Sequence, residues 1–190
     1  MASRPRGIRS AFTLGIILTL AACSSGGLGA SRDSPYAPGI RPGAEAEDGL
    51  IVGHRLMDAG EFELALKAFT RAAAQDGLTV DVLSALGSAN LGLGRLGQAE
   101  TLLRRAIATD EAIPQTWNNL GVVLMEKGET AEAEQIFRRA YALDNGESDS
   151  IRDNLRLALA KNENPDYDVV EQDYKMVRRG TSDFLLRRIN

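Results

Sequence analysis

PQTWNNLGVVLMEKGETAEAEQIFRRAYALDNGE, residues 114–147, decides the fold, because its pattern of small and apolar residues also occurs in the two preceding stretches, at a spacing of 34 residues. A helical hairpin of about 34 residues needs a small residue where its helices cross, a turn residue between them, and large apolar residues facing the next hairpin. The chain is therefore predicted to be all-α, a solenoid of stacked helical hairpins. The columns that agree in all three copies are Gly53, Gly87 and Gly121; Gly60, Gly94 and Gly128; Ala65, Ala99 and Ala133; Phe69, Leu103 and Phe137; and Ala72, Ala106 and Ala140.

The third copy resembles the tetratricopeptide repeat (TPR). Copies one and two depart from that family in part, since Gly49 and Leu83 stand where a tryptophan is expected and Asn90 replaces a large residue. The resemblance implies a helix-hairpin solenoid of about three repeats. The residues that carry it in the third copy are Trp117, Leu120, Gly121, Leu124, Ala133, Phe137 and Ala140.

A fourth stretch begins in phase at Ser148 but lacks a second helix, and it has Leu155 where the earlier copies have the crossing glycine. Repeat arrays need such a solvating cap, because a terminal repeat otherwise leaves an apolar face open to water. The domain from 46 to 161 therefore divides into repeats 46–79, 80–113 and 114–147 and the cap 148–161. Within it, helices are predicted at 47–59, 62–75, 80–93, 96–109, 114–127, 130–143 and 148–161.

Residues 1–22 are predicted to be a signal peptide. Arg4, Arg6 and Arg9 precede an apolar run from Ala11 to Ala22, and a run this short cannot cross a hydrocarbon core of roughly 30 Å as a helix. The following Leu20-Ala21-Ala22-Cys23 resembles the bacterial lipobox, in which the cysteine is lipidated. Lipidation also explains why Cys23 is the one cysteine of the sequence. A chance cleavage site with a free thiol is the alternative.

The lipoprotein resemblance implies a cell-envelope location. Ser24 after the cysteine, instead of an aspartate, favours sorting to the outer membrane, where the domain would face the periplasm. Residues 23–45 read as the lipidated cysteine and a flexible tether, since 12 of the 21 residues from Ser24 to Ala44 are Gly, Ser or Pro. Such a tether typically reaches about 25 Å.

Charge and residue content argue against nucleic-acid binding and catalysis. Removal of residues 1–22 takes away three arginines and no acid, so 19 basic and 26 acidic residues remain and the formal charge is −7. His54 is the one histidine, with no second histidine or cysteine in the mature domain to complete a metal site or a nucleophilic triad. We expect no enzyme activity, no cofactor and no metal.

Protein or peptide binding is the function that the pattern favours. In the TPR family the inner surface is lined by first-helix residues at fixed offsets. For two of the corresponding residues here, Leu91 and Val122, a purely structural role in the core is the alternative. A basic clamp for a terminal carboxylate is not expected, because Leu50, His54, Ala85, Gln115 and Asn119 hold those places. The groove residues that carry over are Leu50, His54, Met57, Asp58, Asp81, Ser84, Ser88, Leu91, Gln115, Asn118, Val122, Met125, Arg152 and Arg156.

The tail, residues 162–190, is expected to be partly helical. Tyr167, Val170, Tyr174 and Val177 fall at helical spacing after Pro165. This first segment could pack back on the array, whereas the last residues could present Phe184, Leu185 and Ile189 to a partner or to the membrane surface. Packing or partner contact is favoured over membrane contact, because two arginines give only weak attraction to lipid.

The combination of lipobox, a few repeats and a short basic-apolar tail resembles the TPR lipoproteins of pilus and secretion systems, particularly that of the Tad-type (Flp) pilus assembly locus. That resemblance implies an assembly factor or pilotin, with a secretin or pilus-assembly components as partners. An adaptor for cell-wall hydrolases is a second hypothesis of the same class. A hydrolytic enzyme is the alternative from a different class.

Cys23→Ser should abolish lipid modification, because the lipid transferase does not accept the oxygen nucleophile, and uncleaved precursor should accumulate. Incorporation of radiolabelled palmitate into the two proteins measures this. A wild-type level of label on the variant would show that Cys23 is not the lipidated residue.

Overall fold

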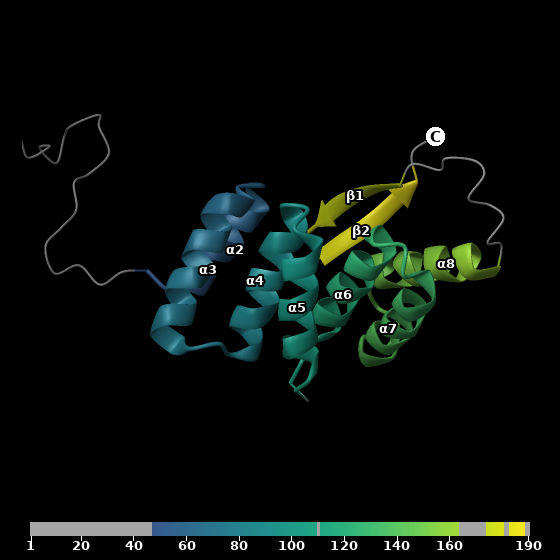
Figure 1. Cartoon of the computed structure of the whole chain (residues 1–190), viewed down its shortest axis with the longest axis horizontal. Helices are drawn as coiled ribbons and strands as arrows, with labels where there is room; N and C mark the ends of the chain where they lie inside the picture. Colours follow the sequence, from purple (N-terminus) through teal and green to yellow (C-terminus); the bar gives the residue numbers. More distant parts are fainter. Residues whose placement is uncertain (1–46, 110, 164–173, 181–182, 189–190) are drawn as a thin grey trace, which may run out of the picture. The chain divides into compact units, whose positions relative to one another are not determined.

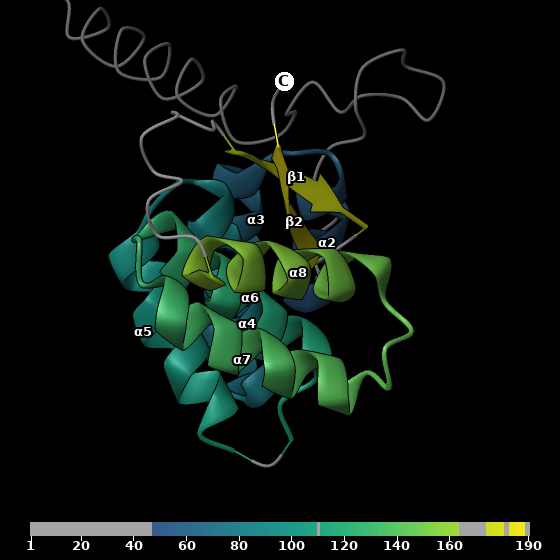
Figure 2. The same ribbon diagram turned by 90° about the vertical axis from the view of Figure 1, so that its right-hand side faces the viewer.

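The computed structural model describes residues 47–109, 111–163, 174–180 and 183–188. In this part of the chain seven helices form three antiparallel pairs and a final single helix (Figures 1 and 2). The predicted helix bounds agree with the observed ones to within two residues, and the all-α repeat fold is confirmed. The helices are α2 (Gly49–Asp58), α3 (Phe62–Asp76), α4 (Val80–Gly92), α5 (Leu96–Ile107), α6 (Pro114–Glu126), α7 (Thr130–Leu143) and α8 (Asp149–Glu163).

The turn glycine of each repeat ends the first helix in a left-handed conformation. Gly60, Gly94 and Gly128 have φ angles of 77°, 70° and 80°. In the first repeat the Gly60 amide donates to the Met57 carbonyl and the Glu61 amide to the Leu56 carbonyl, both at 2.9 Å. This is the Schellman pattern, which satisfies the last carbonyls of a helix and favours glycine. Glycine therefore recurs at this position because the backbone there adopts a left-handed conformation.

The crossing glycine of each repeat lies directly under a large side chain of the second helix. A Cβ atom at Gly53 would lie 2.2 Å from Phe69, one at Gly87 2.6 Å from Leu103, and one at Gly121 2.4 Å from Phe137. The sequence pattern places the crossing of the third repeat near Ala133, and the side chain that covers Gly121 is Phe137, one turn further along α7.

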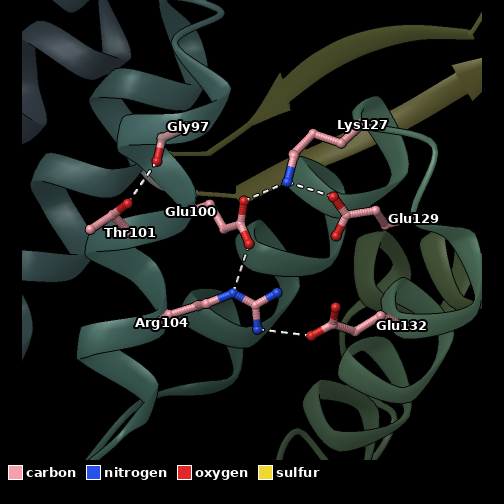
Figure 3. A network of polar contacts seen from close by, with 7 residues as sticks. All are labelled: Gly97, Glu100, Thr101, Arg104, Lys127, Glu129 and Glu132. Atoms are coloured by element: carbon pink, nitrogen blue, oxygen red, sulfur yellow. Dashed lines mark hydrogen bonds and ion pairs between the residues drawn. The ribbon is translucent and has the colours of Figure 1, made fainter.

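An ion-pair network joins the second and third repeats (Figure 3). Glu100 on α5 accepts hydrogen bonds from Arg104 Nε at 2.7 Å and from Lys127 Nζ at 2.6 Å. Arg104 also reaches Glu132 on α7 at 2.8 Å, and Lys127 pairs with Glu129 at 2.5 Å. The hydrogen bonds from Lys127 and Arg104 lower the pKa of Glu100. Glu100 and Arg104 therefore belong to a brace between repeats as well as forming an i,i+4 pair.

Two strands follow the helices. β1 (Tyr174–Arg179) and β2 (Asp183–Arg188) pair antiparallel, with Val177 opposite Leu185. The prediction of a helix through Tyr174 and Val177 is wrong. Their spacing of three fits a helix face, but tyrosine and valine also favour strands, and here cross-strand pairing and packing on the helices decide the conformation.

Several predicted features lie outside the described residues. These are the signal peptide 1–22, Cys23, the tether and the positions Tyr167 and Val170. Among the helices that the structure describes, none is long and apolar enough to cross a membrane.

Gly121→Leu should lower the free energy of unfolding by about 1 to 3 kcal/mol, because the new side chain overlaps the Phe137 ring. The melting temperature followed by circular dichroism should fall by roughly 4 to 10 °C. Gly97→Leu is the matched control, since nothing lies within 4 Å of its Cβ position. Equal melting temperatures for the two variants would contradict the observed crossing.

Candidate functional site

The face lined by the first helices of the repeats carries the β1–β2 hairpin. β2 contacts α6 and α8, and Figure 2 shows both strands on the side of α8 that faces away from α7. We call this face, formed by α2, α4, α6 and α8, the groove. It is the surface from which the sequence predicted ligand contacts, and in the structure a segment of the same chain lies on it.

Two buried side-chain amides hold the backbone of β2. Asn118 Nδ2 on α6 donates to the Phe184 carbonyl at 3.0 Å, and Asn154 Nδ2 on α8 donates to the same oxygen at 2.8 Å. The Leu186 amide donates to Asn154 Oδ1 at 2.9 Å. Asn154 Nδ2 also donates to Asn118 Oδ1 at 2.9 Å, so the two amides orient each other. The groove thus binds an extended backbone through both its donor and its acceptor groups.

The side chains of β2 add apolar and acidic contacts. Phe184 is 1% exposed and Leu186 7%, and both belong to the hydrophobic cluster that contains Val122 and Met125. Asp183 accepts from Ser150 Oγ at 2.7 Å and from Asn118 Nδ2 at 2.9 Å. Burial of the Asp183 carboxyl raises its pKa, with a further contribution from Asp144, against the lowering effect of these hydrogen bonds.

The other strand reaches the first repeat. Arg178 on β1 donates to Asp58 Oδ1 at 3.0 Å and also to the Asp58 carbonyl at the end of α2. Its guanidinium donates in addition to the Gly180 carbonyl at 2.6 Å, within the hairpin turn. The hairpin therefore contacts both the first repeat and the capping helix.

The predicted groove residues differ in their contact with the hairpin and in their burial. That they bind a partner remains a prediction. Asn118 and Asp58 contact the hairpin directly. Leu91 and Val122, for which a core role was the alternative, are fully buried in the same cluster as Phe184. The other buried members are Met57, Ser88 and Met125, the partly buried ones are Leu50, His54, Ser84, Gln115 and Arg152, and the exposed ones are Asp81 and Arg156.

Asn154 and Ser150 are functional candidates that the repeat register missed. A shift of 34 residues from Asn118 leads to Arg152 in the cap helix, whereas the side-chain amide that hydrogen-bonds to β2 belongs to Asn154. One signal for it exists in the sequence: Asn154 stands in an apolar stripe with Ile151 and Ala158 at helical spacing. A polar residue in such a stripe is expected to be hydrogen-bonded when buried.

His54 has a packing environment. Its ring meets Phe69 edge-on with centroids 5.2 Å apart, and burial lowers its pKa against the opposing effects of Asp58, Asp81 and Asp48. Within residues 47–163 and the two strands, apart from the gaps noted above, no group of three His, Cys, Asp or Glu residues could hold a metal ion.

The outward face of the hairpin borders a shallow hollow of about 440 Å³. Val177, Leu185 and Leu186 form its apolar part, and Arg179 and Arg187 lie beside them with Asp153 of α8. This hollow is a second surface on which a partner could lie.

Comparison with known proteins identifies the repeat. The sequence pattern described as "Tetratricopeptide repeat" matches residues 53–115 and 85–148. No curated protein matches the chain.

Solved TPR structures share the fold. The Sgt2 TPR domain from Aspergillus fumigatus is 19% identical, with a TM-score of 0.59 over 75% of this chain and 97% of that one. MamA is 24% identical, with a TM-score of 0.54 over 64% and 70%. The type III secretion chaperone SycD of Yersinia enterocolitica, solved with a peptide of the translocator YopD, is 20% identical, with a TM-score of 0.53 over 61% and 93%.

The raised pKa of Asp183 gives docking of β2 a pH dependence. Because the docked carboxyl binds a proton more readily than the free one, its contribution weakens as pH rises from the ordinary value of 3.8 through the raised pKa. Asp183→Asn cannot ionise and can still hydrogen-bond to Asn118 and Ser150.

The difference in melting temperature, variant minus wild type, should therefore be more positive at pH 7 than at pH 4. Subtracting the wild type at each pH removes the titration of the groups that do not interact with Asp183. A difference that becomes more negative as pH rises would contradict the buried environment of Asp183.

Proposed function

Because this chain belongs to the tetratricopeptide-repeat family, we propose that it is a non-catalytic scaffold whose groove binds an extended segment of a partner protein. TPR surfaces present side chains from successive first helices, and such a surface suits a peptide laid along it. The solenoid fixes these helices rigidly, so the spacing of contacts along a ligand is set before the ligand arrives.

The observation that carries this proposal is the strand already lying in the groove. The side-chain amides of Asn118 and Asn154 donate hydrogen bonds to the backbone of β2, and its Phe184 side chain is buried. The same groups would serve an extended segment of another protein, because backbone carbonyls and amides are common to all sequences.

The proposed location is the periplasmic face of the outer membrane, through a lipid on Cys23. What supports it is the amino-terminal sequence: the arginine-rich start, the short apolar run, the lipobox-like Leu20-Ala21-Ala22-Cys23 and the Gly, Ser and Pro-rich tether. A single acyl chain binds membranes only marginally, whereas several chains on one residue anchor a protein stably. The scaffold would then hold its partner near the membrane.

The proposed role is assembly factor or pilotin for a Tad-type (Flp) pilus or a related secretion system. Its support is a resemblance of layout to TadD, the lipoprotein of that pilus system. The likeness to the secretion chaperone SycD is one of fold alone. In such a role the partner would be a secretin or another pilus-assembly component.

The groove is best tested in a chain that ends before Tyr174, in which β2 does not occupy it. Cross-linking and identification of captured membrane proteins should recover the same partner as the full chain. Asn118→Leu in the shortened chain should lower capture about tenfold. The substitution removes one of the two donors to the bound carbonyl and the oxygen that orients Asn154, and the loss of buried hydrogen bonds costs about 1 to 3 kcal/mol.

Asn162→Leu is the matched control, since this asparagine bonds Thr130 and Glu134 on α7, away from the groove. The helical circular dichroism of all variants should be unchanged. Loss of capture on removing the strands, with the helices intact, would show that the partner binds the hairpin and not the groove.

A further inference from the structure

We propose that β2 is an internal competitor for the groove, and that a partner segment enters by presenting the same pattern: an acidic residue, an aromatic residue, any residue, then leucine. This inference rests on the proposed groove-binding function and specifies its ligand. In the chain itself the pattern is Asp183-Phe184-Leu185-Leu186.

The alternation along β2 defines which positions are read. Phe184 and Leu186 leave the same face of the strand and are buried in the groove. Leu185 leaves the opposite face, where it stands opposite Val177 of β1 and borders the outer hollow. The groove therefore selects the side chains at the positions of Phe184 and Leu186 and leaves the position of Leu185 open.

The acidic position is read by neutral donors. Both carboxylate oxygens of Asp183 are occupied, one by Asn118 and the other by Ser150. No arginine or lysine of the described residues forms an ion pair with Asp183. The groove can thus accept an acidic side chain inside an extended segment without the basic clamp that a terminal carboxylate needs.

The hairpin is held by contacts that a partner could replace. An isolated two-stranded hairpin is marginally stable in water, so its order depends on the surface beneath it. Its buried anchors are Phe184 and Leu186, with Met176 partly buried beside them. The contact to the first repeat comes from one side chain, Arg178, which pairs with the half-exposed carboxylate of Asp58 and donates to the Asp58 carbonyl. An ion pair with an exposed partner contributes little.

The short covalent connection between α8 and β1 makes β2 an effective competitor despite these few contacts. Ten residues, 164–173, join α8 to β1, and a short covalent connection typically raises the effective concentration of a segment to the millimolar range. A free segment with the same contacts binds weakly until the hairpin is loosened. Binding by the groove and release of the hairpin are then one equilibrium.

The test uses the full chain and a fluorescent peptide that copies residues 182–187, Ser-Asp-Phe-Leu-Leu-Arg. Fluorescence anisotropy should give weak binding to the wild type and at least tenfold tighter binding to Phe184→Ala, in which the internal strand has lost its main anchor. Leu185→Ala is the matched control, since that side chain faces away from the groove, and its affinity should equal that of the wild type. The peptide with alanine in place of phenylalanine should not bind either protein.

A second variant guards against a folding defect in Phe184→Ala. Arg178→Ala removes the hydrogen bonds of Arg178 to Asp58 and Gly180 and leaves the hydrophobic cluster intact, and it should raise the affinity two- to threefold. Trypsin supplies an independent readout of release, because cleavage after Arg179 or Arg187 should accelerate when saturating peptide is added to the wild-type chain.

Equal affinity of the peptide for the wild type, Phe184→Ala and Arg178→Ala would overturn the proposal that β2 competes for the groove. Binding without faster cleavage would also overturn it, and would place the peptide on another surface, such as the hollow beside Val177. If either result occurred while the shortened chain still captured its partner through Asn118, the scaffold function would stand without the competitor. Loss of that Asn118-dependent capture would remove the scaffold function itself.

Discussion

The close crossing of two helices within each repeat is the constraint on which the rest of the structure depends. Gly53, Gly87 and Gly121 leave room for Phe69, Leu103 and Phe137 to lie directly on the backbone of the first helix. Those three side chains are fully buried. Any larger residue at the glycine would push the helices apart, because close-packed interiors have no spare volume.

This crossing determines where the groove residues lie. Once the second helix covers one side of the first, a neighbouring side of α2, α4 and α6 is presented together with α8. Asn118 and Asn154 then come from neighbouring elements to one point, where each orients the other at 2.9 Å. Buried amides with every group paired specify one geometry, since an unpaired one is costly. None of the buried side-chain polar atoms in the described residues lacks a partner.

The repeat fold could be predicted because its determinants are local and recur. The glycine at Gly60, Gly94 and Gly128 reports a left-handed turn, and the alanine and glycine columns report close helix contacts. The hairpin could not be predicted in this way. Tyr174 and Val177 fit either a helix or a strand, and the conformation is decided by residues far away in the sequence: β1 pairs with β2, and β2 meets α6 and α8. Asn154 could not be predicted for a related reason: the residue of the cap helix that bonds β2 is not the one that lies 34 residues after Asn118.

Because β2 occupies the groove, the groove residues Val122 and Met125 are buried in the full chain and are not exposed to a ligand. The most direct test is hydrogen exchange of the Leu186 amide in the resting full chain. Docking predicts that this amide, bonded to Asn154 Oδ1 at 2.9 Å, exchanges far more slowly than it would in an open chain, and that Asn154→Ala removes the protection. Exchange at the open-chain rate in the wild type would show that β2 does not occupy the groove.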